Sequence, residues 1–453
     1  MDPDDCLDIL GQQPFLNIYT QICLIFPVPG PSSDRAILDT LTAGLERLST
    51  SLPWVSGQVI KGHSKTGSPA AFRIAPYNAT PILLVKDLRG DGSIPTLHDL
   101  KRARFPFRML DEDIFAPYKT LPGGVAGSGQ APTPVFAVQA SFITGGLILA
   151  FVAQHQAMDL TGQCQVMSIL SKMCRGEKLT NAQIFAANPT RRGRIPTLGD
   201  SYKPGPELEF QMAKPAATKP LTDEAPPLAT WAYFAFSPQS LASIKLVAKE
   251  HVTVPPAYVS TDDALSAFVW KSVGRVRVQR IGVTARSTLG RAVDVRRYLG
   301  VPQTYPGLLQ NMVYHTHTLE ELVSRHLGSI ASELRLAVEP GTSKLARNTQ
   351  ALATMIDRAR DKSVLSLTAR INPNTDLMIS SWTNPTFYNM DFGLGLGKPE
   401  AVRRPRFVPV EGLAYFMPRA LGEEIVLAIC LKGEDMCRLR LDVEFLRHAS
   451  YIG

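Results

Sequence analysis

Short apolar runs alternate along the chain with segments whose apolar residues follow helical spacing. The runs Val135 to Phe142 and Leu147 to Gln154 flank Thr144-Gly145-Gly146 and predict a β-hairpin. Helical spacing begins after Asp159, at Gln163, Val166, Met167, Ile169, Leu170 and Met173. We therefore expect Asp159 in the turn that opens a helix.

The same mixture extends through both halves of the chain. Residues 15–28 are apolar and β-rich, and residues 34–52 place Ile37, Leu38, Leu41, Leu45 and Leu48 on one helical face. Residues 231–236 predict another strand. Ser260-Thr261-Asp262-Asp263 resembles a capping box that opens a helix carrying Leu265, Phe268, Val269 and Val273. The pattern predicts an α/β protein.

Prolines divide this pattern into two parts. They accumulate between about residues 188 and 227, where the periodicity fades. We interpret 188–227 as a crossover linker between an N-terminal domain, 1–187, and a C-terminal domain, 228–453. A Gly/Pro/Ser-rich loop is expected over residues 119–132.

Composition narrows the class of protein. The chain has 453 residues, 45% hydrophobic and 19% charged, which is typical of globular domains. Its net charge is +8, and no run of Lys and Arg residues is denser than Arg191-Arg192-x-Arg194. Because nucleic-acid binders usually carry denser basic segments, we expect no nucleic-acid partner. The six cysteines form no C-x-x-C pair, and signal-peptide and membrane-span patterns are absent from the sequence. We expect a cytoplasmic protein with no membrane partner.

His155 and Asp159 carry the most informative chemistry. The predicted strand ending at Gln154 would hold His155 rigidly at its end, where a neutral imidazole can act as a general base. Asp159 would lie at a helix start, where a carboxylate is electrostatically favoured. A purely structural interpretation is open at this point: a buried His bonded to a backbone carbonyl, and an Asp serving as N-cap.

Other motifs exclude several reactions. The stretch Asp391 to Pro399 is rich in Gly, but Phe392 and Pro399 occupy positions where a phosphate-binding loop requires Gly and Ser/Thr. A dinucleotide fingerprint begun at Gly393 would need Gly where Lys398 stands. No G-x-S-x-G elbow occurs. His315-x-His317 has no third ligand nearby in sequence, and we interpret it as an exposed pair on one strand face. We expect no metal, and Asp391 is interpreted as a buried ion-pair partner in a structural turn.

Four motifs together resemble the BAHD acyltransferases. They are His155-x-x-x-Asp159, the helix starting at Ser260, Asp294-x-Arg296, and Asp391-Phe-Gly-Leu-Gly, in the order and spacing of that superfamily. Within it the chain is similar to the fungal trichothecene 3-O-acetyltransferases over nearly its whole length. Two positions depart from the general pattern: Leu160 replaces a common Gly, and Leu394 replaces a common Trp.

The resemblance implies a fold and a reaction. The fold would be the two-domain, chloramphenicol acetyltransferase-like α/β fold, with mixed sheets flanked by helices and an active-site channel at the domain interface. Acetyl-CoA would be the co-substrate and an alcohol the acceptor, with His155 as the general base of direct acyl transfer. The best acceptor is the C3 hydroxyl of a trichothecene, and a monomer would suffice.

The resemblance also assigns roles to further residues. Ser380 and Trp382 are candidate donors to the tetrahedral oxyanion, although Trp382 could equally be a core residue. Asp159 would pair with Arg296 and orient the His155 loop, and Asp391, Gly393 and Gly395 would form a structural turn near the CoA channel. Candidate partners of the CoA phosphates are Lys271, Lys398, Arg403 and Arg404, each of which could instead be solvated surface charge.

Other interpretations of the function are open. The acceptor could be another terpenoid, polyketide or alkaloid alcohol, or the acyl group could be other than acetyl. The chain could also be a condensation-type amide former that uses the same His motif. A catalytically silent binding protein of the same fold is a further alternative, against which the intact His155 and Asp159 argue.

Overall fold

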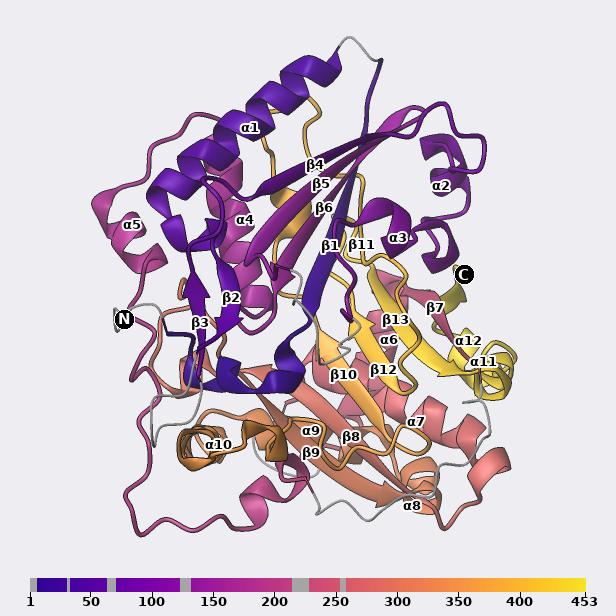
Figure 1. The fold of residues 1–453 in the computed structure, drawn as a ribbon. Coiled ribbons are helices and arrows are strands. Elements are labelled where there is room, and N and C mark those ends of the chain that lie inside the picture. The colour runs from indigo at the N-terminus through magenta and orange to yellow at the C-terminus, as the bar shows by residue number, and fades with distance from the viewer. Residues whose placement is uncertain (1–5, 31–32, 63–70, 123–131, 214–227, 253–257) are drawn as a thin grey trace.

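Two mixed β-sheets organise the protein. The computed structural model describes residues 6–30, 33–62, 71–122, 132–213, 228–252 and 258–453 (Figure 1). The five-stranded sheet has the order β11-β1-β6-β5-β4, and the seven-stranded sheet has the order β14-β7-β13-β12-β10-β8-β9. Both contain parallel and antiparallel pairs, and helices flank them. The predicted α/β fold with two mixed sheets is confirmed.

The first sheet is built mainly from the first half of the chain. Its strands are β1 (Tyr19–Pro27), β4 (Ile82–Asp87), β5 (Phe136–Ile143), β6 (Gly146–Gln154) and β11 (Ala401–Arg403). The predicted hairpin is present as β5 and β6, which pair antiparallel from Ile143↔Gly146 onward. A separate ribbon consists of β2 (Gln58–Lys61) and β3 (Phe72–Ala75).

Helices cover both faces of this sheet. On one face lie α1 (Asp34–Ser51) and α4 (Leu160–Cys174), followed in the chain by α5 (Asn181–Ala187) (Figure 1). Residues of α2 (Leu97–Arg102) and α3 (Glu112–Phe115) share a core with the opposite face. Apolar side chains at helical spacing therefore bury one stripe of each long helix, as the sequence predicts.

The second sheet lies wholly in the second half. Its strands are β7 (Ala229–Phe236), β8 (Arg286–Asp294), β9 (Gln310–Thr318), β10 (Leu377–Ser381), β12 (Leu413–Phe416), β13 (Ile425–Lys432) and β14 (Ser450–Tyr451). Its helices are α6 (Pro238–Lys249), α7 (Thr261–Ile281), α8 (Leu319–Ser324), α9 (Leu327–Val338), α10 (Leu345–Arg358), α11 (Gly433–Leu439) and α12 (Val443–Leu446). The capping box at α7 is present, because Ser260 Oγ accepts the Asp263 N–H and the Asp263 carboxylate accepts the Ser260 N–H.

One apolar core joins the two sheets. Phe136 and Phe151 of the first sheet belong to the same buried cluster as Tyr233, Trp382 and Tyr415 of the second half. The strand β11, from the second half, also completes the first sheet by pairing with β1. The division into domains 1–187 and 228–453 with a linker at 188–227 stays a prediction. The first sheet does not follow this division, because its strand β11 comes from the C-terminal part of the chain.

The segment between the halves is only partly described. Leu208, within a short 3-10 turn at Pro206–Gln211, packs into the core beneath α10. Residues 214–227 of the expected linker, and 123–131 of the expected Gly/Pro/Ser loop, lie outside the described residues. Of the helices that are described, none has the length and apolar character to cross a bilayer.

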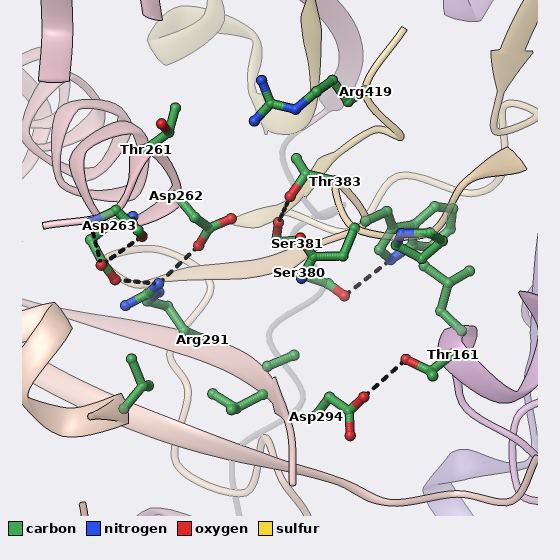
Figure 2. Close-up of a pocket in the computed structure, with 18 of the residues that line it drawn as sticks. Thr161, Thr261, Asp262, Asp263, Arg291, Asp294, Ser380, Ser381, Thr383 and Arg419 are labelled. Carbon is green, nitrogen blue, oxygen red and sulfur yellow. Dashed lines mark hydrogen bonds and ion pairs between the residues drawn. The ribbon is translucent and has the colours of Figure 1, made fainter. Parts of the chain in front are cut away.

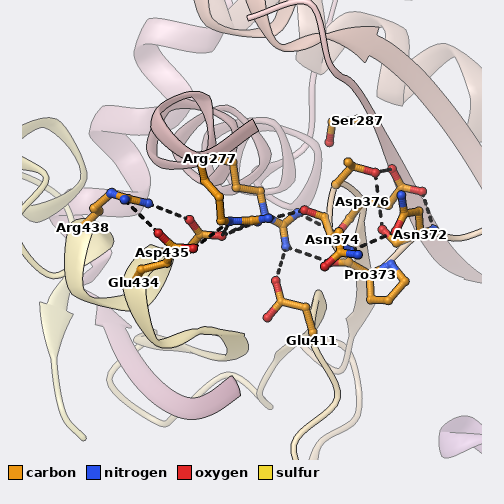
Figure 3. Close-up of polar contacts among 12 residues, drawn as sticks. Arg277, Ser287, Asn372, Pro373, Asn374, Asp376, Glu411, Glu434, Asp435 and Arg438 are labelled. Atoms are coloured by element: carbon orange, nitrogen blue, oxygen red, sulfur yellow. Dashed lines mark hydrogen bonds and ion pairs between the residues drawn. The ribbon is translucent and has the colours of Figure 1, made fainter. Parts of the chain in front are cut away.

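A buried polar network fixes the start of β10 (Figure 3). Arg277 of α7, fully buried, donates to the Asp376 carbonyl at 2.8 Å and to Glu411 Oε1 at 2.7 Å. Asp435 of α11 lies 3.6 Å from Arg277 Nε and also pairs with Arg280. Since Asp376 directly precedes β10, this network ties α7 and α11 to the strand that carries Ser380.

Candidate active site

His155 lies directly after the fully buried strand β6. The His155 N–H donates to the Ile18 carbonyl at 2.8 Å, which continues the pairing of β6 with β1 by one residue. The backbone of His155 is therefore fixed from two strands, and its ring lies at the end of the first sheet.

The ring of His155 is oriented by the loop that follows it. Its Nδ1 lies 3.2 Å from the Met158 carbonyl oxygen, so a proton on Nδ1 is donated there and Nε2 keeps a free lone pair. Burial lowers the pKa of His155 from its ordinary value of 6.5, and the Met158 carbonyl and Asp159 oppose that shift. A neutral imidazole with a free Nε2 can accept a proton.

The Asp159 carboxylate is turned to structural partners. It accepts the Gly162 N–H at 2.9 Å as the N-cap of α4, and the Leu309 N–H at 2.8 Å. Arg296, fully buried, donates to both carboxylate oxygens at 2.8 and 2.9 Å. The expected pair of Asp159 and Arg296 is present. Four hydrogen bonds satisfy the carboxylate, and His155 is not among their donors.

A second buried carboxylate, that of Asp8, holds the same region through other partners. Asp8 Oδ2 accepts from Arg191 Nη1 and from the Leu308 N–H, both at 2.9 Å, and Tyr305 donates its hydroxyl to Asp8 Oδ1. Arg191 Nη1 also donates to the Ala157 carbonyl, inside the His155–Asp159 loop, at 2.7 Å. Sequence reasoning missed Asp8 and Arg191, because their partners lie far away in the chain and no local motif marks them.

Glycines allow the backbone to close around this loop. A Cβ on Gly11 would lie 2.2 Å from the Gln156 carbonyl oxygen, and a Cβ on Gly162 would lie 2.2 Å from the Pro306 oxygen. The Gln156 side chain in turn donates to the Gly11 carbonyl at 2.9 Å. The loop is therefore packed against neighbours that tolerate no larger residue at these two positions.

Ser380 and Trp382 come together at the end of β10. The Trp382 indole N–H donates to Ser380 Oγ at 3.1 Å, so that donor is already used. The Ser380 hydroxyl keeps its own proton to donate onward, and the indole polarises it. The structure thus leaves one free donor where the sequence suggested two.

A cavity of about 1040 Å³ opens at the junction of the two halves (Figure 2). Its walls include Asp159, Thr161 and Cys164 from the first half, and residues of α6, α7, β8 and β10 from the second half. Thr161 donates to Asp294 across the junction at 3.2 Å. The basic side chains in the wall are Lys245, Arg291, Arg297, Arg335 and Arg419. This volume lies at the upper end of small-molecule sites.

The four cations suggested by sequence do not line this cavity. Lys271 donates to the carbonyls of Leu322 and Arg325 at the end of α8, at 3.3 and 2.7 Å, and burial lowers its pKa. Lys398 is exposed and reaches Asn389, 3.2 Å away. Arg403 and Arg404 are buried, at 6% and 3% exposure. The physical reason is local: Lys271 donates to carbonyls left free at a helix end, Arg403 belongs to the buried strand β11, and Arg404 follows that strand directly.

The Gly-rich turn at residues 391–397 is structural, but Asp391 does not form the buried ion pair that the sequence suggested. Gly393 and Gly395 have φ of 66° and 74°, the left-handed region that favours glycine. Asp391 is half-buried rather than buried, and its carboxylate accepts the Gly393 N–H at 2.8 Å instead of pairing with a cation. Phe392 stacks on Phe151 of β6 at 5.2 Å. The turn therefore packs behind the strand that precedes His155, and it does not line the cavity.

Metal ligands are not gathered anywhere in the described part of the chain: no group of three His, Cys, Asp or Glu side chains could hold an ion there. His315 and His317 are half-buried on β9, where His317 Nε2 lies 2.9 Å from Glu333 Oε2. This pair was expected on an exposed strand face, and α9, which carries Glu333, covers it.

Comparisons with known proteins agree with this geometry. Residues 18–174 match the trichothecene 3-O-acetyltransferase-like N-terminal domain, and residues 107–446 match the Transferase family. An O-acetyltransferase of Cryptosporiopsis sp. (strain 8999) is 49% identical, over 100% of this chain and 98% of that protein. Trichothecene 3-O-acetyltransferase TRI101 of Fusarium sporotrichioides is 48% identical, over 99% of this chain and 97% of that protein.

Solved structures give the same result. The crystal structure of F. graminearum TRI101 complexed with coenzyme A and deoxynivalenol is 45% identical, has a TM-score of 0.93 and is covered over 99% of each chain. Vinorine synthase is 16% identical with a TM-score of 0.70, over 99% of this chain and 94% of that one, and shares the fold. The extent of these matches, together with the His155–Asp159 loop at the junction of two mixed sheets, shows that the chain belongs to the Transferase family, that of the BAHD acyltransferases.

Proposed function

We propose that the protein is an acetyl-CoA-dependent O-acetyltransferase that acetylates the C3 hydroxyl of a trichothecene. The observation that carries the chemistry is the geometry of His155: its Nδ1 is bound to the Met158 carbonyl, which leaves Nε2 free as a base. The acceptor is supported by the relatives, since TRI101 of F. sporotrichioides is named a trichothecene 3-O-acetyltransferase and TRI101 of F. graminearum was crystallised with coenzyme A and deoxynivalenol.

The reaction needs one base and no acyl-enzyme. His155 Nε2 takes the proton of the acceptor hydroxyl while that oxygen attacks the thioester carbonyl of acetyl-CoA. The tetrahedral oxyanion collapses, the C–S bond breaks, and His155 returns its proton to the departing thiolate. General-base help contributes roughly 10²- to 10⁴-fold, and positioning and oxyanion stabilisation supply the rest.

Ser380 is the proposed donor to the oxyanion. Its hydroxyl lines the junction cavity and already accepts the Trp382 N–H, so its proton is directed elsewhere. Trp382 then acts through Ser380 and as a wall of the site.

The junction cavity is the proposed site of acetyl-CoA. Its size suits an extended ligand, and Lys245, Arg297 and Arg419 offer cations for the phosphates. Arg291 and Arg335 suit this role less, because they are buried in pairs with Asp262, Asp263 and Glu339. Arg419 also pairs, with Glu423 at 3.0 Å, but that pair is solvent-exposed and can be exchanged for a phosphate. These assignments replace Lys271, Lys398, Arg403 and Arg404.

Asp159 and Arg296 are proposed as positioning residues. Their pair joins α4 to the segment 305–309, since Arg296 also donates to the Tyr305 and Gly307 carbonyls at 3.1 and 2.7 Å. The turn at Asp391 is proposed to support β6 through the contact of Phe392 with Phe151.

The deciding experiment measures release of CoA thiol from acetyl-CoA in the presence of a C3-hydroxyl trichothecene. Wild type is compared with His155→Ala, and a fall of roughly 10²- to 10⁴-fold in kcat is expected. Gln183→Ala, on the exposed surface of α5, serves as the control and should keep wild-type turnover.

Other outcomes separate the alternatives. Turnover that depends on His155 but requires another terpenoid, polyketide or alkaloid alcohol would keep the mechanism and change the acceptor. If no alcohol in a broad panel supports release of CoA thiol, a binding protein of the same fold is favoured. If His155→Ala turns over as fast as the wild type, the mechanism is refuted.

A further inference from the structure

Arg404 differs from the other buried arginines. Seven arginines are buried in the described part of the chain: Arg191, Arg277, Arg291, Arg296, Arg335, Arg403 and Arg404. Five of them pair with carboxylates, and Arg403 donates to the carbonyls of Val402 and Phe105 at 3.0 and 3.2 Å. Among the described residues, no carboxylate lies within 4 Å of the Arg404 guanidinium.

The guanidinium of Arg404 has one long hydrogen bond and contacts with three aromatic rings. Its Nη2 lies 3.4 Å from Thr120 Oγ1, and its buried Nε has no hydrogen-bond partner among the described residues. Its Cζ lies 4.4 Å from the ring centre of Phe407, 4.7 Å from that of Tyr415 and 5.4 Å from that of Trp382. Aromatic faces offset part of the cost of a buried cation, but they do not satisfy its N–H groups.

The backbone holds this side chain in place. The Tyr233 hydroxyl donates to the Arg404 carbonyl at 2.9 Å and accepts the Arg404 N–H at 3.0 Å. Arg404 follows β11, the short strand that crosses from the second half into the first sheet. The guanidinium is thus fixed at the seam between the two sheets, 97% buried, and the described residues offer it one oxygen, Thr120 Oγ1 at 3.4 Å, and no carboxylate.

The position of Arg404 relates it to the reaction centre. It rests on Trp382, whose indole supports Ser380, and its charge acts on His155. Thr120 accepts the Tyr19 N–H through its carbonyl, next to Ile18, which accepts the His155 N–H. Neither Arg404 nor Thr120 lines the large junction cavity. His155 is likewise not among the residues that line that cavity, and the charge of the nearby guanidinium acts on its imidazole.

We propose that Arg404 is a specificity residue that binds a second, hydrogen-bond-accepting oxygen of the acceptor alcohol, close to the hydroxyl that reacts. This inference rests on the proposed O-acetyltransferase function and adds a requirement to it. The acceptor must carry an ether, carbonyl or hydroxyl oxygen beside the reacting carbon, and the free N–H groups of Arg404 recognise it. An alcohol without that oxygen leaves a buried cation unpaired and is rejected.

The test uses two sesquiterpene alcohols that share one carbon skeleton. One carries a ring ether oxygen next to the carbinol carbon, and the other has a methylene group there. Dissociation constants are measured by calorimetry without acetyl-CoA, and kcat and KM are measured with it. The variants are Arg404→Met and Arg404→Lys, and the control is Arg406→Met, a half-exposed neighbour that pairs with Asp111.

In the wild type, the ether alcohol is expected to bind about 10- to 100-fold more tightly than the methylene alcohol. Arg404→Met should abolish this ratio by weakening only the ether alcohol, Arg404→Lys should reduce it, and Arg406→Met should preserve it. The KM for acetyl-CoA should not change. The melting temperature of Arg404→Met should not fall, because no buried carboxylate loses its partner.

Three results would overturn the proposal: an unchanged ratio in Arg404→Met, an equal fall in kcat for both alcohols, or a large loss of stability with the ratio intact. The second result would assign Arg404 to the thioester oxyanion, and the third to packing. If Arg404→Met does not fold, the ratio in Arg404→Lys decides. If the wild type turns over neither alcohol, the proposed function fails, while the binding ratio still decides the role of Arg404.

Discussion

At the scale of single residues, His155 and Asp159 have separate tasks although the chain places them four residues apart. The Met158 carbonyl orients the imidazole, and Asp159 is occupied by Arg296 and two backbone N–H groups. A carboxylate with four donors contributes order to the loop, and its charge reaches His155 only through space.

Asp159→Asn should therefore reduce both stability and turnover. It removes one of the two carboxylates that pair with the fully buried Arg296, and breaking a buried pair costs about 3–5 kcal/mol. Urea unfolding and kcat per folded molecule measure the two effects. Asp87→Asn, at an exposed pair with Arg89, should cost at most about 1 kcal/mol. Full stability with lost turnover in Asp159→Asn would contradict the positioning role.

The pH dependence of kcat/KM should report His155 in the free enzyme. Its pKa is lowered, chiefly by burial, so the neutral base persists below pH 6.5. Activity should be on a plateau near neutral pH and fall only as pH drops through a value below 6.5, where the ring becomes protonated. An acidic limb at or above pH 6.5 would show that burial does not control this group.

At the scale of elements, the catalytic loop depends on the short 3-10 helix Ile9–Gln12, which no periodicity in the sequence connects to it. Gly11 of this helix touches the Gln156 carbonyl, and Asp8, its N-cap, binds Arg191 and Leu308. The N-terminal segment thus forms one wall of the loop that carries the base.

Gly11→Ala should displace this loop. The added Cβ would lie 2.2 Å from the Gln156 oxygen, which is backbone and cannot rotate away. Overpacking of this kind costs about 1–3 kcal/mol, and a shifted base lowers kcat by as much as about 100-fold. Gly199→Ala is the matched control, since its Cβ would meet open space. Equal kcat in the two variants would refute the contact.

Elements with local signals were predictable, and elements without them were not. The hairpin β5–β6 needs only two apolar runs and a Gly-Gly turn, and the capping box at α7 needs only two side chains three residues apart. The strand β11 has three residues and pairs with β1, which lies far from it in the chain. The stability of β11 comes from its pairing with β1, so no local sequence pattern predicts this strand.

At the scale of the whole molecule, buried polar networks hold distant segments in register. Arg277 joins α7 to the start of β10 and to Glu411, and Asp376 extends the network to β8 by accepting the Thr288 N–H at 2.9 Å. These contacts fix the start of β10, the strand that carries Ser380, within the second half (Figure 3). Arg277 itself does not line the junction cavity.

Arg277→Met should destabilise the fold and spare the chemistry. It leaves the largely buried Glu411 without its cation, at a cost of about 3–5 kcal/mol, while Asp435 keeps Arg280 and Arg438. The free energy of unfolding in urea should fall by that amount, and the KM for acetyl-CoA should stay near the wild-type value. Arg102→Met, at an exposed pair with Asp99, should leave both unchanged. A stable Arg277→Met variant would show that the network contributes little.

The sequence by itself determined the class of fold, the hairpin that ends at His155, the helix that Asp159 opens and the family to which these motifs belong. All of these depend on residues close together in the chain, where periodicity and turn chemistry act. The tertiary structure decided which cations face the junction cavity, that Trp382 donates to Ser380, and that Asp8 and Arg191 bind the loop that carries His155. It also decided that Arg404 is buried with no counter-charge among the described residues. Whether a charged side chain is solvated, paired or left free depends on the residues that folding brings next to it. Those residues are distant in the chain, so the local sequence around a charge does not identify them.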